Sequence, residues 1–214
     1  MVRERVPLRR NRDFLLLWVG EVISTLGSQI SLVAFPRLVL ATTHSAVKAG
    51  LVGFANRAPV LAFYLPAGLL VDRQDRRVTM ITSSLVGAFA LASVPVALAL
   101  GDLSFAQIMI VAFLAGTRQV VYSVAEQGAL PLVVAPNQIS EAVARNQARL
   151  EAATLAGPPL GGVLFGVGRV LPFAFDSVSY LASALGAFLV RTPLQEPRNA
   201  ERRSARADIR EAVR

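Results

Sequence analysis

Residues 68–77 read GLLVDRQDRR, and the meaning of this stretch decides the fold. An apolar run ends here, and two aspartates and three arginines follow within ten residues. Three structures would account for such a change. It could be an acid/base site, a basic patch for nucleic acid, or the polar bend between two membrane helices.

The composition of the 214 residues favours the membrane. Hydrophobic residues make up 54% of the chain and charged residues only 17%, with a mean hydropathy of +0.52, whereas about a quarter of residues in globular proteins are charged. The net charge of +8 would suit a nucleic-acid-binding protein if the arginines formed one patch. They lie instead in short polar segments between long apolar runs, so we expect a polytopic membrane protein and no nucleic-acid partner.

Few residues could carry enzymatic or metal chemistry. The chain has no cysteine, which excludes disulfides, thiolate metal sites and a cysteine nucleophile. Its one histidine, His44, is expected in an exposed turn. The sequence contains no HExxH, no GxSxG and no paired catalytic carboxylates within one span. We therefore expect no enzyme, no cofactor and no metal site.

Six apolar stretches are long enough to cross a bilayer as helices, which predicts an all-α membrane protein. About 20 apolar residues span a hydrocarbon core of about 30 Å, and these runs are too long for barrel strands. The first stretch continues past a signal-peptide core and lacks a cleavage site, so it is expected to remain as a span. The expected spans are 14–38, 46–71, 78–100, 105–124, 146–167 and 171–190.

Basic residues orient these spans, because lysine and arginine are retained in cytoplasmic loops. Seventeen of the 22 basic residues lie on the side of the two termini, and only Lys48 and Arg169 lie in the opposite loops. Both termini are therefore expected in the cytoplasm. The chain divides into a basic N-terminus (1–13), a six-helix domain (14–190) and a basic tail (191–214), and GLLVDRQDRR becomes a cytoplasmic bend.

Two spans carry polar residues on one helical face, where contact with lipid would be costly. In the first, residues recur every three or four positions, with Gln29 beside them: Glu21, Ser24 or Thr25, Ser28 and Ser31. In the fourth, the residues at i, i+4 and i+8 are Arg118, Tyr122 and Glu126. We expect both faces to line a water-filled cavity or to contact a partner.

Depth along the helices suggests that two of these residues meet. At 1.5 Å per residue, Glu21 and Arg118 both lie roughly 10 Å from the cytoplasmic side. The hypothesis is an ion pair that lines a cavity, and the alternative is that backbone or water satisfies each residue separately. Asp176 lies near the outer end of the last span, where we expect a hydrated carboxylate, although a site role stays open.

Two motifs resemble those of the major facilitator superfamily of secondary transporters. GLLVDRQDRR matches its signature loop, GxxxDRxxRR, and AGPPLGG in the fifth span matches the GPxxGG core of its antiporter motif. The resemblance implies a gating loop in which the glycine permits close helix contact, the aspartate binds the other half and the arginines pair with acidic helix ends: Gly68, Asp72, Arg73, Arg76 and Arg77. It also implies a flexible, closely packed fifth helix at Gly157, Pro158, Gly161 and Gly162.

The surrounding sequence is similar to the branch of siderophore exporters and macrolide or multidrug efflux proteins. The resemblance implies one half of a twelve-helix fold, built from two inverted three-helix repeats, with a tail like the start of the linker between halves. Such a half would need a C-terminal six-helix half or a second copy. Ser28 stands where many members have aspartate, which excludes a proton-carrying role there, and we expect the unusual Glu126 to pair with Arg76.

The expected function is proton-coupled efflux of a small amphipathic molecule, such as a drug or a siderophore, across a bacterial inner or plasma membrane by alternating access. Glu21 is the expected proton carrier and Asp72 is expected to be structural. The candidates for the cavity and for proton coupling are Glu21, Ser28, Gln29, Arg118, Tyr122 and Glu126. The alternative is a non-transporting six-helix membrane subunit or an inactive transporter fragment.

Overall fold

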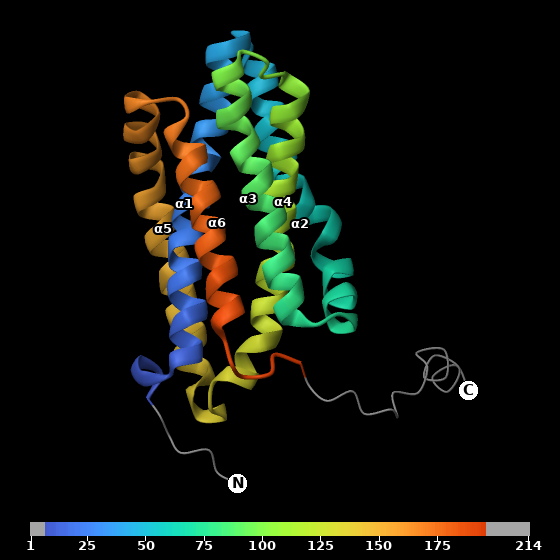
Figure 1. The fold of residues 1–214 in the computed structure, drawn as a ribbon, viewed down its shortest axis with the longest axis vertical. Helices are drawn as coiled ribbons and strands as arrows, with labels where there is room; N and C mark the ends of the chain where they lie inside the picture. The colour runs from blue at the N-terminus through green and yellow to red at the C-terminus, as the bar shows by residue number, and fades with distance from the viewer. Residues whose placement is uncertain (1–6, 196–214) are drawn as a thin grey trace, which may run out of the picture.

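A computed structural model describes residues 7–195, and for residues 64–73 it describes the backbone alone. Six long helices run alternately up and down a bundle and are joined by short turns (Figure 1). They are α1 (Arg12–Thr43), α2 (Ala46–Arg73), α3 (Arg76–Leu100), α4 (Phe105–Val133), α5 (Ile139–Val167) and α6 (Leu171–Leu189), with the short 3-10 helices η1 (Leu8–Arg10) and η2 (Pro136–Gln138). No strand occurs in the described part of the chain, which is all-helical as expected.

Local sequence signals set several helix ends. The side chains of Asn11, Asp75 and Ser104 accept hydrogen bonds from the first free backbone N–H groups of α1, α3 and α4. Gly101, with φ of 79°, ends α3 in the left-handed conformation, and the exposed His44 ends α1 in the same way. The bend in GLLVDRQDRR therefore has a local cause, because Asp75 starts a new helix two residues after α2 ends.

Five helical segments of the described chain are long and apolar enough to cross a membrane: α1, α3, α4, η2 with α5, and α6. Two helices extend well beyond the expected spans, because α4 continues to Val133 and α5 begins at Ile139. An apolar run marks the part of a helix that contacts lipid, whereas backbone hydrogen bonds can continue the helix into the polar region.

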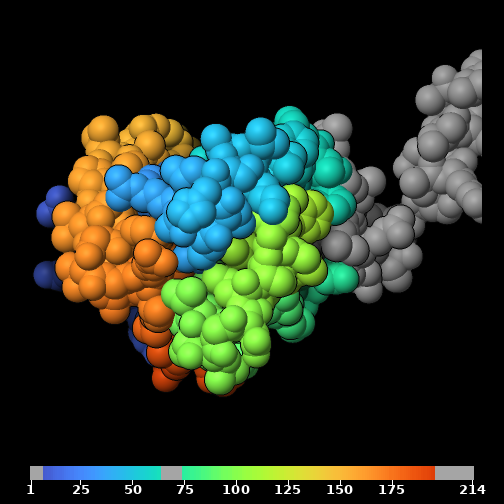
Figure 2. Space-filling model, turned by 90° about the horizontal axis from the view of Figure 1, so that it is seen from above, coloured from blue at the N-terminus to red at the C-terminus, as the bar shows by residue number. Residues whose placement is uncertain are grey.

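α1 and α4 are the first helices of two three-helix units, α1–α3 and α4–α6. α1 packs mainly against α5 and α6, and α4 packs mainly against α2 and α3, while α5 and α2 lie at opposite edges (Figure 1). When α1, α2 and α3 are matched in order with α4, α5 and α6, the contact of α1 with α5 corresponds to the contact of α4 with α2. The first helix of each three-helix unit is thus packed against the other unit. Figure 2 shows the α1–α2 end (blue) between the α5–α6 end (orange) and the α3–α4 end (green).

Two apolar clusters fill the bundle. One contains Phe14, Met80 and Tyr122, and the other contains Phe35, Leu91, Phe173 and Tyr180. In the second cluster, the rings of Phe35 and Phe173 meet edge to face with centroids 5.0 Å apart. Polar side chains of α1, α4 and α6 lie where the two clusters meet.

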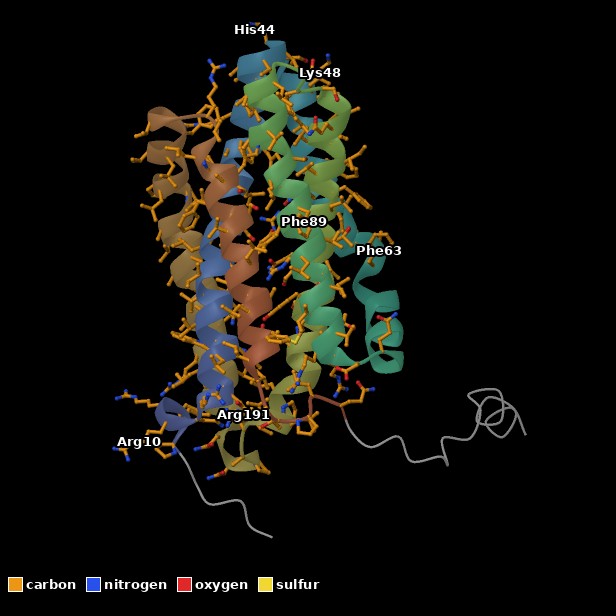
Figure 3. The ribbon with its side chains drawn as sticks, in the orientation of Figure 1. Arg10, His44, Lys48, Phe63, Phe89 and Arg191 are labelled. Atoms are coloured by element: carbon orange, nitrogen blue, oxygen red, sulfur yellow. The ribbon has the colours of Figure 1, made fainter. Side chains whose placement is uncertain are left out.

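The two ends of the bundle differ in charge. Figure 3 places Arg10 and Arg191 at one end and His44 and Lys48 at the other. Phe89, on α3, points outward from the side of the bundle and is 71% exposed. Exposed aromatic and aliphatic side chains along helices of this length are suited to contact with lipid rather than water.

Candidate functional site

An ion pair joins α1 and α4 in the middle of the bundle. Both guanidinium Nη groups of Arg118 donate to the carboxylate of Glu21, Nη1 to Oε1 at 3.3 Å and Nη2 to Oε2 at 2.8 Å. Ser183 of α6 donates to Glu21 Oε2 at 2.9 Å and accepts from Arg118 Nη2 at 3.0 Å. Both charged residues are 2% exposed. The pairing that helix depth suggested is confirmed, and it includes a third helix.

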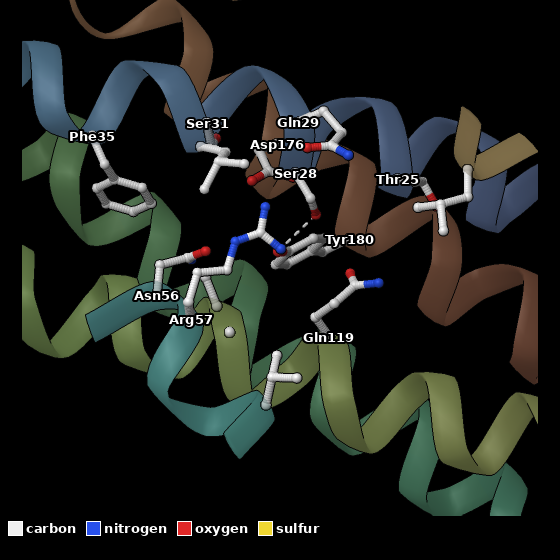
Figure 4. A pocket seen from close by; sticks show the side chains of 15 residues that line it. Thr25, Ser28, Gln29, Ser31, Phe35, Asn56, Arg57, Gln119, Asp176 and Tyr180 are labelled. Carbon is white, nitrogen blue, oxygen red and sulfur yellow. Dashed lines mark hydrogen bonds between the residues drawn. The ribbon is translucent and has the colours of Figure 1, made fainter. Parts of the chain in front are cut away.

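Two tyrosine rings enclose the guanidinium of Arg118. Its Cζ lies 4.5 Å from the ring centroid of Tyr122, on its own helix, and 4.3 Å from that of Tyr180, on α6. Each face of an aromatic ring attracts a cation, and the attraction is stronger where water is excluded. The hydroxyl groups of Tyr180 and Ser28 are 3.0 Å apart and share a hydrogen bond (Figure 4). Arg118 is therefore fixed by a carboxylate, a serine and two rings.

A small pocket of about 90 Å³ lies beside this pair. Its polar lining comes from α1, α2, α4 and α6: Thr25, Ser28, Gln29, Ser31, Asn56, Arg57, Gln119, Asp176 and Tyr180 (Figure 4). Ser28 and Gln29 line it, but Glu21, Arg118, Tyr122 and Glu126 do not. The Glu21–Arg118 pair thus lies outside the lining of this pocket. Successive helical residues point about 100° apart, so Gln119 faces the pocket while Arg118 faces α1 and α6.

The pocket has both polar and apolar walls and is too small for a drug. A water molecule occupies about 30 Å³ of liquid, so 90 Å³ suits a few waters, whereas ligand pockets usually exceed about 300 Å³. Gln29 donates to Thr154 of α5 at 2.7 Å, and Asn56 donates to the carbonyl of Ala112 at 3.1 Å. Arg57 forms no ion pair with any residue of the described part of the chain. Its guanidinium points into the pocket (Figure 4).

Asp176 is buried in the bundle, which corrects the expectation of a carboxylate hydrated at the outer interface. It is 0% exposed, and Ser179 Oγ lies 3.1 Å from its Oδ1. Its Oδ2 has no hydrogen-bond partner. Position along the helix suggested an interfacial site, but α6 is covered on its sides by α1 and α3. Lateral packing, which hydropathy along one helix does not report, removes this carboxyl from water.

Glu126 pairs with an arginine of α5, where the sequence suggested Arg76. Arg149 donates through Nη1 and Nη2 to the two carboxylate oxygens of Glu126 at 2.9 and 3.0 Å, and Asn146 Nδ2 lies 3.4 Å from Oε1. α4 and α5 are joined by the short η2 turn, so these residues face each other across a helical hairpin. The residues between 124 and 146 were expected outside the spans. In the structure most of them are helical, in the end of α4, in η2 and in the start of α5, and this places Glu126 opposite Arg149.

The signature loop is only partly described, because the side chains of Gly68, Asp72 and Arg73 lie outside the described set. The backbone N–H of Arg76 donates to the side chain of Gln195 at 3.3 Å. Arg77 Nη2 donates to the carbonyl of Thr192 at 2.9 Å. The loop between α2 and α3 therefore contacts the segment that follows α6.

In the fifth-helix motif, two glycines mark where α5 crosses α1. A Cβ on Gly157 would overlap the Cβ of Gln29, and a Cβ on Gly161 would lie 2.8 Å from the carbonyl oxygen of Ile30. Pro158 is exposed, and the nearest atom to a Cβ on Gly162 is Arg37 Nη1 at 3.4 Å. Half of the motif thus brings α5 close to α1, beside the pocket residue Gln29.

The N-terminus of α1 is tied to the chain after α6, a contact that the sequence did not predict. Asp13 Oδ2 accepts from the backbone N–H of Thr192 at 2.8 Å, from its hydroxyl at 2.6 Å and from the N–H of Arg191 at 3.3 Å. Partial burial acts to raise the pKa of Asp13, but these hydrogen bonds outweigh it and the pKa lies below its usual value. A short polar side chain in a predicted cytoplasmic segment carries no sequence signal for such a distant partner.

Comparison of the sequence with known proteins places the chain in a family. Residues 4–214 match the family described as transmembrane secretion effector. Macrolide efflux protein A of Streptococcus pyogenes is 24% identical over 181 residues, which cover 84% of this chain and 45% of that protein. The multidrug efflux pump Tap of Mycobacterium tuberculosis is 33% identical over 168 residues, with coverage of 72% and 38%. The staphyloferrin A transporter of Staphylococcus aureus is 27% identical over 171 residues, with coverage of 75% and 41%.

The chain spans less than half the length of each of these relatives. No solved structure gives a significant match. The matched family model covers nearly the whole chain, and the apolar helices identify a multi-pass membrane protein. The chain therefore belongs to the transmembrane secretion effector family of the major facilitator superfamily.

Proposed function

We propose that this chain is the N-terminal six-helix part of a proton-coupled exporter of small amphipathic molecules. The main support for this proposal is the pocket, in which polar side chains of α1, α2, α4 and α6 converge inside an apolar bundle. Its volume of about 90 Å³ fits one wall of a substrate site better than a whole site. A second six-helix half, or a second copy, would supply the opposite wall, with the substrate between the halves near the midplane.

The proposed topology has six spans with both termini in the cytoplasm of a bacterial cell. The separation of the arginine-rich end from the opposite end supports it (Figure 3). The reciprocal packing of α1 on α5 and of α4 on α2 supports two inverted three-helix repeats. In this topology the signature loop and the chain after α6 share the cytoplasmic end. The signature-loop residues named above would form a gate there, with Asp72 binding the other half.

Proton coupling needs a carboxyl group that binds and releases a proton during the cycle. The sequence predicted Glu21 as this proton carrier. In the structure, however, its carboxylate accepts hydrogen bonds from both Nη groups of Arg118 and from Ser183. Hydrogen bonds to a charged partner favour the ionised form. We therefore assign Glu21 and Arg118 to holding α1, α4 and α6 together, and Ser28 and Gln29 to the wall of the substrate site.

The test is reconstitution of efflux from two polypeptides. The 214-residue chain is expressed in an efflux-deficient bacterium, alone and together with the C-terminal half of macrolide efflux protein A, and export of erythromycin and ethidium is measured. We expect efflux with both polypeptides, abolished by a protonophore. Efflux by the 214-residue chain as a monomer would overturn the requirement for a second half. No efflux in either strain, with both chains correctly inserted, would favour a non-transporting membrane subunit.

A further inference from the structure

Asp176 differs from the other buried carboxyl groups near the centre of the bundle. Glu21 and Glu126 each accept two hydrogen bonds from an arginine. Asp176 is equally enclosed, at 0% exposure, yet no arginine or lysine of the described chain pairs with it and its Oδ2 has no partner. It is also the only one of the three that lines the pocket.

Ser179 gives the carboxyl group of Asp176 only a shared hydrogen bond. Its single hydroxyl hydrogen has two acceptors, the carbonyl oxygen of Asp176 at 2.7 Å and its Oδ1 at 3.1 Å. A donated hydrogen bond stabilises the ionised carboxylate, but one shared donor replaces little of the solvation that a carboxylate loses on burial.

Apart from Arg57 of α2, the charged groups around Asp176 do not supply an unpaired cation in the described conformation. Arg118 of α4 is the nearest candidate, but its charge is balanced by Glu21 of α1 and enclosed by Tyr122 and by Tyr180 of α6. α3 has no charged residue between position 77 and its end at position 100, and α5 adds only Leu150 to the pocket. An unpaired ionised carboxylate in such a place would lose several kcal/mol of solvation, so the group takes up a proton instead.

Arg57 of α2 is the remaining cation, and it shares the pocket with Asp176 (Figure 4). Its guanidinium has no acidic partner in the described part of the chain. Both side chains line the same pocket, so a change of rotamer of the long arginine side chain is the movement by which the two would pair. Arg57 is therefore a further cation, not committed to another carboxylate of the described chain, that can pair with an ionised Asp176.

We infer that Asp176 is the proton-binding site of the pocket and that Arg57 is the alternative partner of its carboxyl group. In one state Asp176 is neutral and Arg57 is free in the pocket. In the other, the O–H bond of the acid breaks, the proton passes to water in the pocket, and the electron pair stays on a carboxylate that pairs with Arg57. Protonation thus decides whether the pocket offers an unpaired guanidinium to an anionic group of a ligand.

This inference deepens the proposed function by naming its proton site, but its test does not require transport. The purified 214-residue chain in lipid nanodiscs is titrated while the infrared carbonyl band of protonated carboxylic acids is recorded. Surface aspartates and glutamates are ionised at neutral pH and give no such band. We expect one protonated band at neutral pH, shifted by ¹³C-aspartate labelling, which tests the intact chain without any substitution.

Variants assign the band and test the partner. Asp176→Asn should remove the band, Asp176→Glu should restore a shifted one, and Glu141→Gln, at a glutamate whose side chain is 55% exposed, should leave it unchanged. Arg57→Gln should move the loss of the band to higher pH, and Arg57→Lys should reverse most of that change. No protonated aspartate band at neutral pH, or a band that persists in Asp176→Asn, would overturn the proton site. An unchanged titration in Arg57→Gln would overturn the role of Arg57.

Discussion

Neutralising one member of the Glu21–Arg118 pair should destabilise the bundle more than neutralising both. Glu21→Gln leaves a buried guanidinium that cannot lose its charge. Removal of one partner from a buried ion pair costs about 3–5 kcal/mol, or about 10²- to 10⁴-fold in the folding equilibrium constant. Arg118→Gln leaves a carboxyl that can take up a proton, so its cost should decrease at low pH, whereas that of Glu21→Gln should not.

The double variant Glu21→Gln/Arg118→Gln removes both charges and keeps groups that can form hydrogen bonds. Replacement of a whole buried pair by neutral residues is often close to neutral for stability. The double variant should therefore be more stable than Glu21→Gln alone. Because a single neutralisation costs about 3–5 kcal/mol and the double change little, the corresponding coupling energy is expected to exceed about 3 kcal/mol.

The measurement is reversible unfolding by sodium dodecyl sulfate in mixed micelles, followed by the fluorescence of Trp18. This is the sole tryptophan, and its Nε1 donates to the carbonyl of Arg145 at 3.4 Å, so it reports the contact between α1 and α5. The control cycle uses the surface pair Glu141 and Arg145, at 2.7 Å, for which about 0.3–0.5 kcal/mol is expected. A coupling energy for the buried pair no larger than that of the surface pair would refute the reasoning.

Three further predictions concern other contacts of the bundle. Gly161→Ala should cost about 1–3 kcal/mol, because its Cβ would lie 2.8 Å from a backbone carbonyl oxygen of α1, whereas Gly162→Ala should be tolerated; thermal unfolding compares them. Arg149→Gln should cost about 3 kcal/mol by leaving Glu126 buried and unpaired, and should accelerate amide hydrogen exchange in α5. Asp13 has a lowered folded pKa, so its contribution to stability, complete above the unfolded value near 3.8, is lost as pH falls through the folded pKa. Asp13→Asn should remove this acid-dependent loss, as measured by unfolding at a series of pH values.

Each of these predictions has a contrary result. Equal melting temperatures of the two glycine variants would remove the special role of Gly161. Exchange in α5 unaffected by Arg149→Gln would mean that the pair with Glu126 does not hold the helix. An acid profile of Asp13→Asn identical to that of the unsubstituted chain would assign the acid sensitivity to other carboxyl groups.

Helix positions and depths were predictable from the sequence because they depend on local quantities. Apolar runs locate helices, and a rise of 1.5 Å per residue placed Glu21 and Arg118 at the same depth, where they meet. The depth of a residue along its helix does not show in which direction around the helix axis its side chain points. The placement of Arg118 between Tyr122 and Tyr180, and away from the pocket, depends on how α1, α4 and α6 are arranged.

The errors have the same origin. Asp176 was expected in water because of its height in α6, but neighbouring helices bury it from the side. Glu126 was expected near Arg76 because its span was expected to end at 124, whereas α4 continues to Val133 and faces α5. In both cases the apolar run indicated only which part of the helix contacts lipid. The burial of Asp176 and the partner of Glu126 depend instead on which helices lie side by side.

The interlocked packing of the two three-helix units has a consequence for how the protein is made. α1 is synthesised well before α5 and α6, against which it is buried. Glu21 and Arg118 are separated by 97 residues, which a ribosome adds in about 5–20 s at about 5–20 residues per second. During that interval the first helix carries an acidic residue with no arginine to neutralise it. We expect α1 to wait in the protein-lined environment of the insertion machinery, and to enter lipid fully only when α4 has arrived.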